Sequence, residues 1–138
     1  MKPTRWQQRF ENFERAFMLL QSVFSERSLK NFSALEKEGI VQRFEYTFEL
    51  AWKTLKDYLE FSGMILNQIT VREVIKQAFA AKIIEDGQAW INMLEDRNIM
   101  SHTYSQTAFE KAVIAIADYY LPALNQVFLF LKQKDFTA

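Results

Sequence analysis

The stretch that decides the fold is "WQQRFENFERAFMLLQSVF", residues 6–24. Its large apolar side chains recur at spacings that alternate between four and three residues: Trp6, Phe10, Phe13, Phe17, Leu20 and Phe24. This spacing is typical of one apolar face of an α-helix that packs against other helices, as in a bundle or a coiled coil. The stretch therefore predicts a first helix that ends near Ser25 and turns this face toward a helical core.

Composition favours the same fold class. The chain has 138 residues but only 3 glycines and 2 prolines, which is too few for the many tight turns of an all-β fold. The length suits one domain with a real core, and no linker or internal repeat divides the sequence. We therefore expect a single all-α domain over residues 1–138.

Capping signals mark where further helices begin. Ser33 followed by Glu36 forms a capping-box pattern, so a second helix should start there and continue to a C-terminal glycine, Gly63. Thr70 repeats the pattern before a short third helix, whose predicted apolar face consists of Val71, Val74, Ile75, Ala78 and Phe79.

A fourth helix follows Asp86 and Gly87, and a fifth should run from about residue 108 to 132. Thr107 is the predicted cap of the fifth helix, together with Glu110. Pro122 lies inside this helix and should kink its axis. The fold we predict is an antiparallel four-helix bundle with an additional short helix.

The predicted second helix carries apolar side chains on two sides. A main stripe faces one way, and a second stripe of Tyr46, Leu50 and Phe61 faces the other. Exposed apolar patches on small proteins are usually interfaces, so the second stripe favours a homodimer. The alternative is that the bundle covers both sides itself.

Charge and cysteine content exclude several classes of function. The 17 basic and 17 acidic residues balance, so any contact with RNA should be local. Without cysteine there is no disulfide, zinc–thiolate site or thiol nucleophile, and we expect neither a metal nor a cofactor. The most apolar stretch, residues 112–131, is interrupted by polar side chains and is typical of a buried helix rather than a membrane span. A cytoplasmic protein without membrane contact is expected.

The fourth helix contains an arginine where its pattern calls for an apolar residue. Its inward stripe consists of Trp90, Met93, Leu94, Met100 and Tyr104, and Arg97 falls at the centre of that stripe. An arginine side chain keeps its proton, and burying its charge unpaired costs several kcal/mol. Arg97 therefore needs an anionic partner, which is either a carboxylate of the protein or the phosphate of a ligand.

The second helix supplies the candidate carboxylates. Glu45 borders the main apolar stripe and is the better internal partner for Arg97, and Glu49 is the other. Glu49 and Lys53 are spaced as a surface ion pair, the plainer interpretation of these two residues. All three could instead orient a ligand.

The other polar residues near Arg97 are each weak signals when taken singly. A histidine near a helix C-terminus, such as His102, commonly interacts with the helix dipole, and Tyr104 alone suits a core position with its hydroxyl at the rim. Asn98 lies on the same flank as His102. On a straight helix Arg97 and His102 point about 140° apart, so joint action requires the helix to end or bend near Ser101, or a second protomer.

The spacing of these residues is more informative than any one of them. "RNIMSHTY", residues 97–104, fits the pattern R-x-x-x-x-H-x-Y and resembles the signature of the HEPN superfamily of small helical-bundle proteins. "QRFEYTFELAWKTLKDYLE", residues 42–60, resembles the second-helix signature of one branch, the nucleotidyltransferase substrate-binding proteins. The likeness extends over most of the chain, including the order of helices.

The resemblance implies a dimer that forms a complex with a minimal nucleotidyltransferase encoded nearby. For members with the intact motif it implies a metal-independent ribonuclease site where two protomers meet, a toxin neutralised by the transferase. In some pairs the transferase adds AMP to the motif tyrosine, here Tyr104. Another interpretation of the family is a non-catalytic substrate- or nucleotide-binding subunit of a two-component transferase.

The chemistry of the residues fits the catalytic version in outline. RNA cleavage without a metal needs a base, an acid and a cation for the charged phosphorane; His102 suits either of the first two roles and Arg97 the third. Chemistry with two histidines requires a dimer, because the chain has only one. Asn98 and Tyr104 are candidate ligand-binding or modified residues, with Glu45, Glu49 and Lys53 in supporting roles. A third hypothesis is a pure interaction module in which Arg97 is a structural pin.

Overall fold

The computed structural model describes residues 2–26, 31–102 and 105–135, and over these residues every regular element is a helix. The elements are α1 (Arg5–Glu26), α2 (Ala34–Phe61), α3 (Val71–Ala80), α4 (Gly87–Met100), α5 (Gln106–Ala115), the π-helical turn η2 (Ile116–Tyr120) and α6 (Leu121–Lys134). The predicted all-α class is confirmed.

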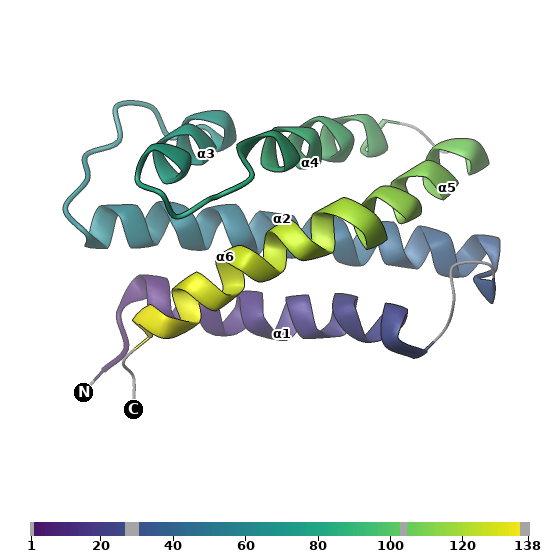
Figure 1. The fold of residues 1–138 in the computed structure, drawn as a ribbon, viewed down its shortest axis with the longest axis horizontal. Coiled ribbons are helices and arrows are strands. Elements are labelled where there is room, and N and C mark those ends of the chain that lie inside the picture. The colour runs from purple at the N-terminus through teal and green to yellow at the C-terminus, as the bar shows by residue number, and fades with distance from the viewer. Residues whose placement is uncertain (1, 27–30, 103–104, 136–138) are drawn as a thin grey trace.

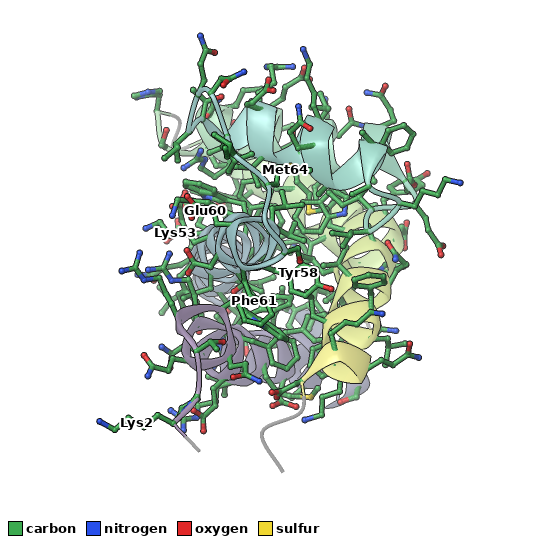
Figure 2. All side chains as sticks on the ribbon, turned by 90° about the vertical axis from the view of Figure 1, so that its left-hand side faces the viewer. Lys2, Lys53, Tyr58, Glu60, Phe61 and Met64 are labelled. Carbon is green, nitrogen blue, oxygen red and sulfur yellow. The ribbon has the colours of Figure 1, made fainter. Side chains whose placement is uncertain are left out.

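The long helix α2 lies at the centre of the arrangement. α1 runs beside it in the opposite direction, and α3 and α4 lie along its other side (Figure 1). The run of α5, η2 and α6 crosses from the end of α4 past α2 to α1. Seen from the end in Figure 2, α1 lies below α2, α3 above it and α6 to its right, and the side with Lys53 and Glu60 faces outward. α4 contacts α2, α3 and η2, and its contact with α2 positions the candidate site.

The apolar face predicted for the first helix forms the core. Trp6, Phe10, Phe13, Phe17 and Leu20 are fully buried and Phe24 is half-buried, so the prediction is confirmed. Phe128 of α6 packs against this face, with ring centroids 5.6 Å from Phe10 and 5.4 Å from Phe17.

The predicted caps of the second and third helices are present. The Ser33 hydroxyl accepts from the Glu36 N–H at 3.1 Å, and the Glu36 carboxylate accepts from the Ser33 N–H at 2.9 Å. Gly63 ends α2 at φ 95°, in a Schellman motif in which the Met64 N–H donates to the Leu59 carbonyl. Thr70 caps α3 by accepting from the Glu73 N–H.

The prediction for the last helix is wrong at its start. Ser105 caps it by accepting from the Ala108 N–H, whereas Thr107 is exposed and lies inside the helix. Pro122 was predicted to kink the last helix. A π-helical turn lies just before it, and in this turn the Leu121 N–H donates to the Ile116 carbonyl.

The helical run of residues 106–134 is long and apolar enough to cross a membrane by length and composition. However, 44% of its most apolar window is buried inside the protein. Leu124, Val127 and Leu131 lie in the core beside α1 and α2. Burial of this extent is typical of a core helix in a globular protein, which is what the sequence predicted.

Four apolar side chains of the faces predicted for α2 and α3 differ in how far they are buried. Phe79, expected in the apolar face of α3, is 52% exposed, and its ring lies over Gly87, where a Cβ atom would come within 3.0 Å of it. Tyr46 and Phe61, expected on the second stripe of α2, are 38% and 61% exposed. Leu50 of that stripe is half-buried and packs on the core.

The end of α3 provides a test of backbone strain. Lys82 has φ 64° and occupies the Schellman position that Gly63 fills at the end of α2, with the Ile83 N–H donating to the Ala78 carbonyl. Lys82→Gly should raise the free energy of unfolding in urea by about 0.5–1 kcal/mol, because glycine adopts this conformation without a Cβ clash. Lys76→Gly, an exposed position inside α3, should lower it by about 1 kcal/mol. Equal effects of the two changes would contradict the strain at Lys82.

Candidate functional site

Arg97 lies in the last turn of α4 with 25% of its side chain exposed. Its Nη1 donates to the Glu49 carboxylate of α2, and its guanidinium carbon lies 5.7 Å from the centre of the Phe48 ring. The Nε atom is buried and has no hydrogen-bond partner among the described residues. The guanidinium is therefore paired at Nη1, and its Nε has no partner among the described residues.

The prediction that Glu45 is the better internal partner of Arg97 is wrong, because Glu49 forms the ion pair. Glu49 also pairs with Lys53 at 3.7 Å, as its spacing predicted. The Glu49 carboxylate thus lies between two cations, one from each of two helices. Figure 2 shows Lys53 on the flank of α2, on the same side as Glu60.

Glu45 lies one helical turn before Glu49 and is half-buried. It forms no hydrogen bond or ion pair with a described residue. Burial raises the pKa of the Glu45 carboxyl above its ordinary value of 4.5, and the positive charge of Arg97 offsets part of this rise. Glu45 is thus a free carboxylate within the electrostatic reach of Arg97.

His102 follows directly after the end of α4. The helix ends at Met100 with Ser101 as its cap, and the His102 N–H donates to the Ile99 carbonyl. The helix therefore ends near Ser101, which is the condition stated above for joint action of Arg97 and His102. Because His102 lies beyond the helix, its direction does not follow from helical geometry. His102 is exposed, and within the described part of the chain no hydrogen bond or ion pair links it to Arg97.

The remaining predicted site residues are not gathered at Arg97. The Asn98 side chain is exposed on the outer surface of α4. Tyr104 lies outside the described residues. The structure therefore brings together Arg97, Glu49 and Lys53, with Glu45 near them.

Sequence reasoning missed one buried polar contact next to Arg97. The buried Tyr120 of η2 donates its hydroxyl to the Asp96 carboxylate of α4. The Tyr120 ring stacks on Phe44 of α2 at 5.3 Å. Burial and the Asp96 carboxylate raise the pKa of Tyr120, so it stays a neutral donor. This contact fixes the last turns of α4 against η2. The sequence signal that could have predicted it is a tyrosine within an apolar helix, because a buried tyrosine hydroxyl usually needs a hydrogen-bond partner.

In residues 2–26, 31–102 and 105–135 no group of three or more histidine, cysteine or acidic side chains is placed to hold a metal ion. The site offers the Arg97 guanidinium, the Lys53 ammonium and the carboxylates of Glu45 and Glu49, and the exposed His102 lies two residues beyond the end of α4. These groups can bind a phosphate and move protons.

The chain is similar to several known proteins. A family model described as "nucleotidyltransferase substrate binding protein like" matches residues 8–133. A "probable ribonuclease HepT" from Haemophilus influenzae is 32% identical over 82 residues, a match that covers 57% of this chain and only 54% of that relative. A crystal structure of a protein from Thermus thermophilus has a TM-score of 0.73 at 28% identity, covering 87% of this chain and 98% of that one.

The bridging role of Glu49 can be tested by double-mutant cycles on stability. Glu49→Gln combined with Arg97→Met should give a coupling of about 1 kcal/mol, because this pair is half-buried. Glu49→Gln combined with Lys53→Met should give less than about 0.5 kcal/mol, because that pair is more exposed. Urea denaturation measures both, and couplings in the reverse order would contradict the assignment of Glu49 to Arg97.

The environment of Glu45 predicts how stability depends on pH. A carboxyl whose pKa is raised by folding contributes stability below its unfolded value, and this contribution is lost as pH rises through the folded pKa. Glu45→Gln should therefore be more stable than wild type at pH 7, and the difference should shrink as pH falls toward 4.5. Urea denaturation across this pH range measures it; a difference that does not vary with pH would contradict a raised pKa.

Proposed function

This chain belongs to the nucleotidyltransferase substrate-binding protein family, a branch of the HEPN superfamily, and on that premise we propose that it is a ribonuclease subunit that cleaves RNA without a metal. Its proposed partner is a minimal nucleotidyltransferase encoded nearby, which neutralises it. The similarity to a probable ribonuclease supports the activity, although it spans about half of that relative.

The observation that carries the proposal is the state of the Arg97 guanidinium. It is half-buried, it is held by a carboxylate, and its Nε is left without a partner among the described residues. A phosphodiester would satisfy more of its donors than Glu49 does, because a guanidinium grips phosphate through two parallel hydrogen bonds. His102, just beyond the end of α4, would transfer a proton to or from the reacting oxygens. Asn98 and Tyr104 would contact the bound RNA.

The proposal includes a homodimer. In it residues 1–138 form one HEPN-like domain, an antiparallel four-helix bundle with α3 as the additional short helix. The observation that supports an interface on α2 is the exposure of Tyr46 and Phe61, two residues of the predicted second stripe.

The transferase would control this activity by modification. Transfer of AMP to Tyr104 would add a negative charge and bulk two residues after His102, where both would oppose the binding of an RNA phosphate. A toxin of this kind acts on cellular RNA, so we place it in the cytoplasm.

A second candidate function is a non-catalytic nucleotide-binding subunit of a two-component transferase. The balance of 17 basic and 17 acidic residues favours it, because RNA-binding proteins usually carry a strong positive field. In this case Arg97 would bind the phosphate and His102 would have no role. Calorimetry with a panel of nucleotides tests this function, which predicts binding that survives His102→Ala unchanged and disappears with Arg97→Met. RNA cleavage separates the two functions, because this one predicts no cleavage by the wild type.

The ribonuclease proposal predicts that the purified wild-type protein cleaves a short RNA in the presence of EDTA. His102→Ala should reduce the rate by about 10²–10⁴-fold, the usual cost of removing a general acid or base. Thr107→Ala, an exposed change on the following helix, is the control and should leave the rate unchanged. Growth of cells that express each variant without the transferase gives a second readout. The proposal is contradicted if the wild type is as harmless as His102→Ala and neither protein cleaves RNA.

A further inference from the structure

Two buried polar atoms without a hydrogen-bond partner lie where the start of α1 meets the last turns of α2. The Asp57 side chain of α2 is 1% exposed, and Trp6 of α1 is 2% exposed. The Asp57 Oδ2 accepts no hydrogen bond from a described residue, and the Trp6 Nε1 donates none to one. A buried polar atom without a hydrogen bond costs stability, so two of them at one place require an explanation.

The negative charge of Asp57 is already balanced. Lys56 Nζ donates to its Oδ1 at 3.2 Å, and Arg9 Nε lies 3.4 Å from its Oδ2, as an ion pair without hydrogen-bond geometry. A third cation, such as a lysine of a partner protein, would therefore gain little here. The carboxylate lacks a neutral N–H donor at Oδ2, and the Trp6 indole lacks an acceptor.

Asp57 and Trp6 line a cavity of about 290 Å³, close to the lower end of the range for small-molecule sites. The other residues that line it are Thr4, Arg5, Glu60 and Phe61. Figure 2 looks onto this end of the molecule and shows Glu60 and Phe61 at the end of α2. The exposed Phe61 ring lies 6.3 Å from the Trp6 ring, centroid to centroid, so the cavity has an aromatic wall.

The unpaired groups of the cavity match one edge of guanine. A carboxylate can accept from two parallel N–H donors, and an indole N–H needs one acceptor. The Watson–Crick edge of guanine presents N1–H and N2–H side by side, with the O6 acceptor next to them. The other three RNA bases do not offer two adjacent donor nitrogens on this edge. Bases of single-stranded RNA are commonly recognised in this way, by hydrogen bonds to their edges and by contact with aromatic side chains.

We propose that this cavity binds a guanine base of the RNA substrate. Asp57 accepts from N1–H and N2–H, the Trp6 Nε1–H donates to O6, and the Phe61 ring lies against the base. Because both polar atoms are buried, the base shifts the exposed side chains at the rim, those of Arg5 and Phe61, as it enters. The inference rests on the proposed ribonuclease function, and it gives that function a base preference.

The cavity and Arg97 can be reached by one RNA strand. Glu49, which pairs with Arg97, is followed at spacings of four by Lys53 and Asp57, so these three residues follow one flank of α2. Asp57 lies about 12 Å further along the helix axis than Glu49. Lys53 lies between them with 44% of its side chain exposed, where it can bind a phosphate of the same strand. Phe61 also belongs to the surface proposed for the homodimer, so the RNA would run beside that interface.

The test is binding of a short labelled RNA to the purified full chain, measured by fluorescence anisotropy. The RNA is a 2′-O-methyl oligouridine with one guanine, and matched RNAs carry hypoxanthine or adenine at that position. Hypoxanthine lacks only the N2 amino group of guanine. The wild type should bind the guanine RNA about tenfold or more tightly than either of the others, because a hydrogen bond to a charged group contributes this much. In the cleavable form of the guanine RNA, the cut should lie at a fixed distance from the guanine.

Two variants test the assigned contacts. Trp6→Phe should weaken binding of the guanine RNA by about 2- to 10-fold, the effect of one lost neutral hydrogen bond. Trp90→Phe is the matched control and should leave it unchanged, since this buried indole also has an unpaired Nε1 but does not line the cavity. Asp57→Asn should prefer xanthine over guanine, because the amide can donate to the xanthine O2. A purely structural role of Asp57 would not produce that exchange of preference.

The outcomes separate this inference from the proposed function. If the wild type binds the three RNAs with affinities within about twofold of one another, or binds none of them, the guanine pocket is overturned, whether or not the protein cleaves RNA. If it prefers the guanine RNA as expected but cleaves no RNA, the ribonuclease function fails and the guanine pocket stands. Should Asp57→Asn not fold, as urea denaturation would show, the comparison of guanine with hypoxanthine on the wild type still decides.

Discussion

The structure around α4 depends on the fixed charge of Arg97. A guanidinium stays protonated at any pH a protein meets, so a fold that turns it inward must provide an anion. α2 provides Glu49, held between Arg97 and Lys53, and the Phe48 ring lies under the guanidinium. The ion pair joins α2 to α4 near the point where α4 ends. It holds a cation in the last turn before His102.

The same region contains features that cost stability. Within the described part of the chain, the buried Nε of Arg97 has no partner, and Glu45 is half-buried without one. Natural proteins tolerate such defects mainly where a function needs them. The adjacent contact between Tyr120 and Asp96 offsets part of this cost, because it satisfies a buried hydroxyl and fixes α4 against η2. Rigid support beside unsatisfied groups is typical of a site prepared for a ligand.

Local signals in the sequence predicted most of the fold. The aromatic spacing of residues 6–24 and the caps at Ser33 and Thr70 depend on neighbours within one or two turns, and these predictions are confirmed. The start of the last helix was missed because Ser105 and Thr107 are both acceptable caps, and the local pattern does not choose between them.

The partner of Arg97 could not be predicted from periodicity. Glu45 and Glu49 lie on the same face of α2, and the choice between them depends on how α4 is shifted along α2. That shift is set by packing between residues distant in the sequence, including Tyr120 on Phe44. The exposure of Phe79 was not predicted because it too depends on a residue from another part of the fold. Gly87 lies against one side of the Phe79 ring, and the rest of the ring is exposed.

The most direct test of the central claim is the response of the Arg97 Nε–H to a phosphodiester. In a proton–nitrogen NMR spectrum this signal is assigned by its loss in Arg97→Lys, and the protein is titrated with a short 2′-O-methyl RNA, which cannot be cleaved at its modified sugars. The account predicts a large, saturable shift of this signal, because the phosphate takes the place of Glu49 on the guanidinium. A signal that stays unmoved while the RNA binds elsewhere on the protein would show that Arg97 is only a structural pin.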